Sequence, residues 1–292
     1  MFNSLLYLLL LILSVSGGHH TTSKARVSKP PTYLLEKVFD LTDELSETSG
    51  IIIYDSLLWT FNDSGDEAFI YGLDLTTGTI SRTIEISNGK NKDWEDIAQN
   101  QEYIFIGDFG NNDGSRKDLQ IFMIQKQSIM NQQYQQLDAS VIDFCYEDQK
   151  DFTPATFANQ YDCEAMIAIR DSLYLFTKDW LNLQTSIYSL PASEGKFTAR
   201  HVRDFECEGL VTGADYNSNS RRVVLCGYSL FYPFVIIIND MNELKVVKRI
   251  EFEEISGLQV EGIAFIDDNS FYISNEKSSD LQALYRVIWN NN

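Results

Sequence analysis

Glu261-Gly-Ile-Ala-Phe-Ile, residues 261–266, is one of five copies of a phrase that recurs along this chain of 292 residues. Each copy begins with a hydroxyl or carboxyl side chain and continues as a short apolar run. A turn and a second apolar run with a polar end follow. A period near 50 residues that contains only strands is typical of radial β-architectures. The copies begin at Ser49, Glu95, Glu164, Thr212 and Glu261.

From Tyr33 onward, the apolar runs are short, alternate with polar residues and are bounded by Gly, Asn, Asp or Ser, which is typical of strands and turns. Four repeats can be laid out as four strands each, and the last, from Val260, has only three. The apolar segment 33–41 supplies the missing strand if it pairs with the C-terminal strand, and this pairing would remove exposed edges. The sequence therefore predicts an all-β fold, a five-bladed β-propeller closed by its N-terminal strand. A six-bladed propeller is the alternative, with the extra blade in 125–161.

The composition and the N-terminus indicate a secreted protein. The net charge is -19, which argues against nucleic acid, because phosphate neutralisation dominates that binding. The apolar run 5–15 is too short for a transmembrane helix, so we expect residues 1–18 to be a signal peptide; an uncleaved anchor is the alternative. We expect a disordered leader over 19–32 and one β-propeller domain over 33–292. The prediction is an extracellular or periplasmic monomer without membrane contact after cleavage.

The chain has four cysteines, an even number that permits two disulfides in a secreted protein. The sequence leaves three connectivities open and slightly favours Cys145–Cys163 with Cys207–Cys226. The alternative is that several are free buried thiols, because Cys packs well as a small apolar side chain.

The first residue of each phrase points to a metal site. In a propeller the innermost strand of each blade runs along the central channel, so five oxygen-bearing side chains would converge there. Three converging carboxylates repel one another unless their pKa values rise or a cation lies among them. Hard oxygen ligands of mixed charge suit Ca²⁺. The predicted metal ligands are Ser49, Glu95, Glu164, Thr212 and Glu261; the alternative is that these side chains face a water-filled funnel.

The ends of the second strands supply the candidates for catalysis. Asp63 and Asp108 are candidate general bases, and Lys178 is a candidate to hold an anionic group. The alternatives are ordinary turn chemistry for the two aspartates and neutralisation of the ring carboxylates for the lysine. Trp94 and Trp180 could form a stacking wall for a sugar or a base, or pack between blades. The expected partner is a small-molecule, carbohydrate or phosphate ligand.

The order hydroxyl, Glu, Glu, hydroxyl, Glu resembles the axial calcium site of the calcium-activated nucleotidase (apyrase) family, as do Val260-Glu261-Gly262-Ile263 and Glu164-Ala165 followed by Leu173-Tyr174-Leu175-Phe176. That resemblance implies a five-bladed propeller, a bound Ca²⁺ and hydrolysis of nucleoside di- and triphosphates. The loops that contact nucleotide in that family have no match here. Asn62-Asp63-Ser64-Gly65, Asp93-Trp94-Glu95-Asp96 and Gly107-Asp108-Phe109-Gly110 are similar to secreted bacterial propeller proteins of unassigned function.

Three functions remain open from the sequence. The first is a Ca²⁺-dependent hydrolase of phosphoester or phosphoanhydride bonds at the channel mouth. The second is a non-catalytic propeller that binds a ligand or a protein and in which Ca²⁺ ties the blades together. The third is a metal-dependent lactonase or esterase.

Overall fold

The computed structural model describes residues 33–131, 133–230, 232–278 and 281–290, which belong to one compact unit. The predicted signal peptide and leader lie outside these residues. Among the described residues, no helix has the length and apolar character needed to cross a membrane.

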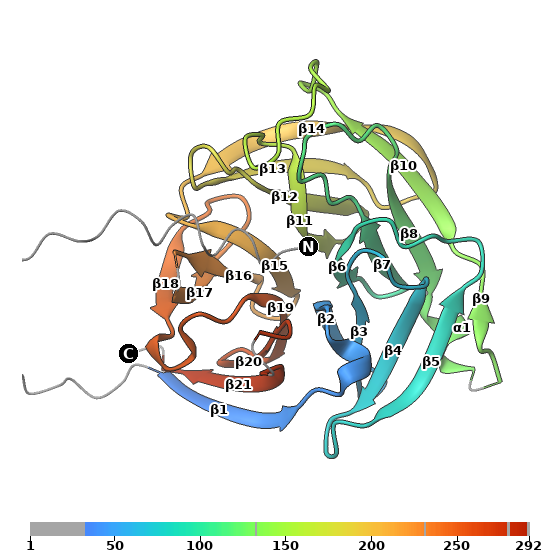
Figure 1. Cartoon of the computed structure of the whole chain (residues 1–292), viewed down its shortest axis with the longest axis vertical. Coiled ribbons are helices and arrows are strands. Elements are labelled where there is room, and N and C mark those ends of the chain that lie inside the picture. The colour runs from blue at the N-terminus through green and yellow to red at the C-terminus, as the bar shows by residue number, and fades with distance from the viewer. Residues whose placement is uncertain (1–32, 132, 231, 279–280, 291–292) are drawn as a thin grey trace, which may run out of the picture. The chain divides into compact units, whose positions relative to one another are not determined.

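Antiparallel strands make up almost all of the fold (Figure 1). They form five groups of four, in which each strand pairs with the next. The fifth group is completed by the N-terminal strand, which pairs antiparallel with the C-terminal one, as the sequence predicts. The groups are β2 (Thr48–Tyr54), β3 (Leu57–Asn62), β4 (Phe69–Asp74) and β5 (Ile80–Ile86); β6 (Trp94–Gln99), β7 (Tyr103–Asp108), β8 (Leu119–Gln125) and β10 (Ser140–Tyr146); β11 (Asp162–Ile169), β12 (Ser172–Lys178), β13 (Thr185–Pro191) and β14 (Gly195–Phe205); β15 (Leu210–Asn217), β16 (Arg222–Ser229), β17 (Tyr232–Ile238) and β18 (Val246–Glu251); and β19 (Val260–Asp267), β20 (Ser270–Asn275), β21 (Ala283–Trp289) and β1 (Tyr33–Asp40).

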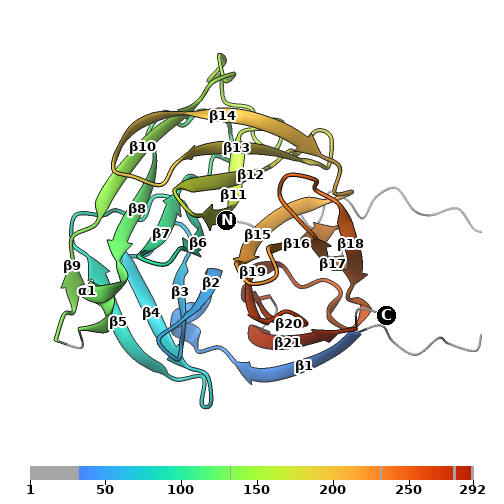
Figure 2. The same ribbon diagram turned by 180° about the vertical axis from the view of Figure 1, so that it is seen from behind.

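The first strands of the groups make a closed ring. β2 contacts β6, and the contacts continue through β11, β15 and β19 back to β2. Figure 2 shows the same strands from behind, with these five innermost. The start of every group therefore lies near the start of its neighbours, and this arrangement gathers residues that are about 50 positions apart in the sequence.

Apolar packing between neighbouring groups holds the ring together. Among the described residues there are five core clusters, and each one joins the facing sides of two consecutive groups. One example is Trp94, which is fully buried and contacts Phe61 and Phe122 at ring-centroid distances of 5.4 and 5.7 Å. Trp94 is therefore a core residue, and the interpretation as part of a ligand-stacking wall is wrong for it.

Two pairings at the outer edges were not predicted. β10 and β14 pair in parallel, which joins the second and third groups into an eight-stranded sheet. The short strand β9 (Gln136–Leu137) pairs in parallel with β5. α1 (Lys126–Met130) precedes β9, and two 3-10 turns lie at Asp43–Leu45 and Glu253–Ile255.

The four cysteines are free thiols, so neither favoured disulfide is present. Cys163, Cys207 and Cys226 are buried, and Cys145 is exposed on β10. Buried thiols pack as small apolar side chains, which was the alternative interpretation of these residues.

Candidate functional site

Each predicted ring residue lies at a β-bulge on the first strand of its group. On β6, Trp94 pairs with Asp108 and Asp96 with Gly107, so that Glu95 is the extra residue. The same shift in register occurs at Ser49-Gly50, Glu164, Thr212 and Glu261. A bulge re-aims the side chain of the extra residue. The repeat therefore specifies a backbone irregularity at one position in every group, together with a polar residue there.

The two hydroxyl residues of the ring bond to backbone. The Ser49 hydroxyl donates to the carbonyl oxygen of Glu95 on the next first strand. The Thr212 hydroxyl donates to the carbonyl oxygen of Val260 at 2.5 Å. Both side chains thus link neighbouring first strands, and their hydroxyl protons face a backbone acceptor.

The three ring glutamates are buried and lie in one electrostatic environment. Burial raises the pKa of Glu95, and repulsion from Glu164, Asp63 and Asp93 adds to the shift. Burial also raises the pKa of Glu261 to about 7, against the opposing effect of Lys178. Carboxyl groups in such surroundings take up protons or bind cations at neutral pH.

Lys178, at the end of β12, neutralises one of these carboxylates. Its Nζ lies 2.8 Å from Glu164 Oε2, with both side chains buried. Burial alone would lower the pKa of Lys178, but attraction from Glu164, Tyr228 and Glu261 raises it well above its ordinary value. The ammonium group is therefore charged and engaged within the cluster.

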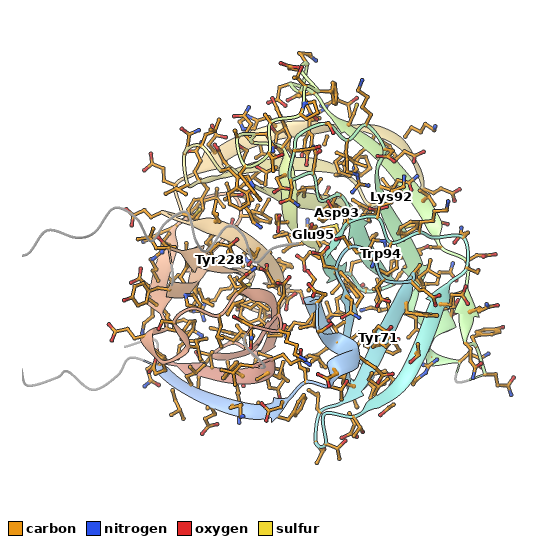
Figure 3. All side chains as sticks on the ribbon, viewed as in Figure 1. Tyr71, Lys92, Asp93, Trp94, Glu95 and Tyr228 are labelled. Atoms are coloured by element: carbon orange, nitrogen blue, oxygen red, sulfur yellow. The ribbon has the colours of Figure 1, made fainter. Side chains whose placement is uncertain are left out.

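Three carboxylates converge beside Glu95. One oxygen each from Asp63, Asp93 and Glu95 lies within 4.8 Å of the other two. Asp63 follows β3 directly, and Asp93 precedes β6 directly, so two neighbouring groups supply the trio. Figure 3 shows Asp93 and Glu95 nearer the middle of the ring than Trp94 and Lys92.

Asn91 fixes the approach of these two segments. Its amide nitrogen donates to the carbonyl oxygens of Asn62 and Asp63 at 2.8 and 2.9 Å. Its amide oxygen accepts from the backbone N–H of Trp94 at 3.2 Å. The side chain therefore ties the end of β3 to the start of β6, and it acts as a positioning residue for the carboxylates.

Asp63 and Asp93 titrate near neutrality. Burial raises the pKa of Asp63 to about 6 despite the N–H of Ser64 and the charge of Lys178. Burial, with repulsion from Asp63, raises the pKa of Asp93 to about 7. A groove of about 380 Å³ reaches Asp63, so this end of the trio is accessible from solvent.

The backbone of Gly110 packs closely against the carboxylates of Glu95 and Asp93. A Cβ atom at this position would lie 2.1 Å from Glu95 Oε1 and 2.6 Å from Asp93 Oδ2. Only glycine leaves room for the two carboxylates there. The Gly110 N–H donates to the Asp93 carbonyl at 3.2 Å, which holds the loop in place.

Asp108 lies behind the trio and is paired. Its Oδ1 accepts from Arg116 Nη2 at 2.9 Å and from the Asp93 N–H at 3.2 Å. Its Oδ2 is buried without a partner among the described residues. Arg116 also approaches Asp93 Oδ2 at 3.9 Å. Asp108 therefore supports Asp93 through the arginine and through the backbone.

Glu276 is an acidic residue of the site that was not among the predicted site residues. It follows β20 directly, and burial and repulsion from Glu261 and Asp63 raise its pKa well above its ordinary value. Asp93 was quoted only within a longer motif. The signal that could have found both residues is position, because Asp93 directly precedes the strand that carries Glu95, and Glu276 directly follows the strand that pairs with the start of β19, beside Glu261.

A separate carboxylate reaches across the ring. Asp96 Oδ2 accepts hydrogen bonds from the backbone N–H of Met166 on β11 at 2.7 Å and from that of Ala214 on β15 at 3.3 Å. Asp96 Oδ1 accepts a hydrogen bond from the backbone N–H of Ile97 at 2.8 Å. Asp215 similarly accepts the N–H of Phe265 on β19 at 2.8 Å. These carboxylates satisfy the inner edges of first strands, which have no strand partner on that side.

Comparisons with known proteins identify a fold and no sequence family. No protein-family model and no curated protein matches the chain. A solved glucose dehydrogenase structure is similar over 87% of this chain and 99% of that chain, with a TM-score of 0.51 and 6% identity. The likeness shows an all-β fold of the β-propeller kind.

Two further structures match less well. The PQQ-bound aldose sugar dehydrogenase of Streptomyces coelicolor covers 90% of this chain and 100% of its own, with a TM-score of 0.47 and 11% identity. The hydrazine synthase of Kuenenia stuttgartiensis covers 80% of this chain with a TM-score of 0.41 and 11% identity. This chain spans 57% of that hydrazine synthase chain.

Proposed function

We propose that this protein is a secreted five-bladed β-propeller that binds Ca²⁺ at Asp63, Asp93 and Glu95 and uses the site to hydrolyse phosphoester or phosphoanhydride bonds. The observation that carries the proposal is the convergence of three carboxylate oxygens within 4.8 Å of one another. Two oxygens bound to one Ca²⁺ at 2.3–2.6 Å lie at most about 5 Å apart, so this spacing fits a shared ion.

The five antiparallel groups support five blades. Segment 125–161, the alternative place for a sixth blade, contains α1, β9 and β10. β10 is the fourth strand of the second group, where it pairs with β8, and β9 pairs with β5 of the first group. Among the described residues, β19 also contacts β2 directly, which closes the ring of five first strands.

The proposed ligand set changes from the one that the repeat alone suggests. Ser49 and Thr212 donate their hydroxyl protons to backbone carbonyls, and Glu164 is paired with Lys178. Of the predicted ring residues, Glu95 remains a proposed Ca²⁺ ligand, and Asp63 and Asp93 are the two other proposed ligands. Glu164 and Glu261 then contribute negative potential around the ion, which favours a divalent cation over none.

The proposal of hydrolysis rests on two features of the site: a cation bound by Asp63, Asp93 and Glu95, and a carboxylate that could accept a proton. A bound divalent cation supplies a Lewis acid for a phosphoryl oxygen and for a water molecule. Asp63 lines the groove, so its carboxylate would lie beside a water molecule or substrate that enters there and could accept a proton. Asp108, the other candidate base, is held by Arg116, so the geometry favours Asp63.

One observation favours the second function, a binding propeller with a structural ion. The two cations of the site, Lys178 and Arg116, are already paired with carboxylates. Neither is free to hold a polyanionic substrate. In that case the cation would link the end of β3 to the start of β6 and would stabilise the ring without catalysis.

The experiment starts from chelator-treated protein. Calorimetric titration with Ca²⁺ should show binding, and Glu95→Gln and Asp93→Asn should weaken it by more than the roughly 10–100-fold that loss of an outer-shell partner costs. Glu102→Gln, an exposed acid at the β6–β7 turn, is the matched control and should bind as the wild type does. Unchanged affinity in both site variants would refute the metal site.

Catalysis is tested separately on the same proteins. Phosphate release from a nucleoside diphosphate should require Ca²⁺ and should be lost in Glu95→Gln. Calcium-dependent stabilisation without turnover on phosphate, ester or lactone panels would refute the hydrolase and support the binding propeller.

A further inference from the structure

A second site lies at the other end of β19 from Glu261. A groove of about 450 Å³ opens between the β15–β16 turn, the β19–β20 turn and β21. Its volume is within the ~300–1,000 Å³ that is usual for small-molecule sites. β19 begins at Val260 and ends at Asp267, in the groove, so that the strand separates the two sites. Val260 lies next to the acidic cluster, by which we mean the carboxyl groups of Asp63, Asp93, Glu95, Glu164, Glu261 and Glu276. The lining residues are Asn217, Asn219, Ile266, Asp267, Asp268, Asn269, Ser270, Arg286 and Ile288.

Two polar groups in this lining have no partner among the described residues. Arg286 is half-buried on β21, and its Nε is fully buried without a hydrogen bond. Ser270 is 2% exposed, and its hydroxyl is likewise unpartnered. A buried donor without an acceptor costs about 1–3 kcal/mol, so two of them beside one groove indicate a missing acceptor.

The opposite wall is held in place by hydrogen bonds. Asn217 Nδ2 donates to Asp268 Oδ1 at 3.1 Å, and Arg222 Nη1 donates to the Asp268 carbonyl at 3.1 Å. The Asn269 N–H donates to Asp267 Oδ1 at 2.8 Å. Each of these carboxylates keeps an oxygen with no hydrogen bond to the described residues, which can accept from a ligand.

Both signs of charge line the groove, with Arg286 on one wall and Asp267 and Asp268 on the other, and this mixture favours a neutral ligand. A simple anion that approached Arg286 would meet Asp267 and Asp268, and a simple cation that approached the aspartates would meet the guanidinium group. Hydroxyl groups both donate and accept, so a neutral polyol satisfies both walls. Ile266 and Ile288 give apolar surface for the C–H face of a ring.

We propose that this groove binds a neutral saccharide of one or two rings, with Arg286 and Ser270 donating to its oxygens and Asp267 and Asp268 accepting from its hydroxyl groups. The site is independent of the proposed Ca²⁺ site, because none of the groove residues belongs to the acidic cluster.

The test uses the full chain and named sugars. Glucose, galactose, N-acetylglucosamine, maltose and cellobiose are offered singly, and binding is followed by saturation-transfer NMR and calorimetry. Arg286→Gln should weaken binding of the preferred sugar about tenfold or more, because hydrogen bonds to charged groups are the strong ones. Arg203→Gln, on the exposed strand β14, is the matched control and should leave the affinity unchanged.

Ser270→Ala keeps the test valid if Arg286→Gln unfolds the chain. Removal of an unpartnered buried hydroxyl should not lower the melting temperature, but it should still weaken sugar binding several-fold. Absence of binding for every sugar, or equal binding by both groove variants and the wild type, would overturn the proposal. Competition by sodium sulfate or by spermidine would overturn it too, because it would assign the groove to an ion.

Chelator-treated protein and Glu95→Gln separate this site from the other one. Both should bind the sugar as well as the untreated wild type does. Loss of sugar binding in either would show that the groove depends on the acidic cluster, and it would contradict the independence stated above.

Discussion

Lys178 Nζ and Glu164 Oε2 form an ion pair of 2.8 Å whose two side chains are 7% and 4% exposed. Three further buried carboxyl groups, those of Glu95, Glu261 and Glu276, interact electrostatically with this pair, and burial raises the pKa of each, so that they become negatively charged when a cation replaces their protons. One ammonium group therefore compensates only part of the charge of the cluster, and the remainder is available to a cation.

Lys178→Met should destabilise the protein by about 3–5 kcal/mol, because it leaves Glu164 buried and unpaired. Urea unfolding measures the change. Adding Glu164→Gln should restore most of the loss, and a double-mutant cycle gives the coupling. Equal destabilisation in the single and double variants would show that the pair contributes little.

The stability of the metal-free protein should fall as the pH rises from about 4 to 7. The folded-state pKa of Asp93 is about 7, against an ordinary value of 3.8, so the folded chain holds a proton that the unfolded chain has lost. Its stabilisation is complete below pH 4 and lost above 7. Asp93→Asn should flatten the profile by at least about 1 kcal/mol, as measured by thermal unfolding in chelator.

Calcium should oppose this loss at neutral pH. At 100 times its Kd, a ligand adds about 2.7 kcal/mol of stability, or roughly 5 °C in Tm for a domain of this size. Tm measured at pH 7.5 with Ca²⁺ and with chelator checks this expectation. A shift of the same size in Glu95→Gln would contradict it.

Gly110→Ala should remove the cation site while the strands stay intact. The added methyl group would displace the carboxylates of Glu95 and Asp93, and affinity for Ca²⁺ should fall at least tenfold. Gly257→Ala is the control: its Cβ meets no atom within 4 Å, and the variant bears only the strain of a positive φ. Calorimetry on both variants decides the question.

Asp96→Ala should loosen the centre of the ring. The substitution leaves the N–H groups of Ile97, Met166 and Ala214 without their acceptor, at about 1–3 kcal/mol for each buried donor. Hydrogen exchange should accelerate at Met166 and Ala214 on two other strands. Unchanged protection at these two amides would show that the carboxylate does not bridge the strands.

The strands were largely predictable because their signals are local. The alternation of apolar and polar residues predicts four strands for each of the first four repeats, and β3, β4, β5 and β7 are examples of such strands. The pairing of β1 with β21 also followed, since a three-stranded last group needs a fourth strand. The parallel pairing of β10 with β14 has no such signal, because it depends on how two outer edges meet in space.

The site was predictable in its position and less so in its contacts. The repeat marked Glu95, Glu164 and Glu261 as polar positions at the starts of the first strands, and the β-bulges at these positions were not predicted. The sequence could not show that Ser49 turns to a neighbouring carbonyl, because the hydroxyl rotamer depends on the adjacent strand. Asp93 was not assigned because it lies two positions before the repeated phrase, although three of the five repeats carry an acid there: Glu47, Asp93 and Asp162.

The pairing of β1 with β21 has a consequence for biosynthesis. The last strand of this sheet leaves the ribosome more than 240 residues after the first, so β1 waits for its partner until all the other groups have been made. Until then the nascent chain presents open strand edges to its neighbours on the polysome, and closure depends on contacts of the greatest sequence separation in the molecule. Deletion of the final strand would therefore produce a product that is trapped in this open state.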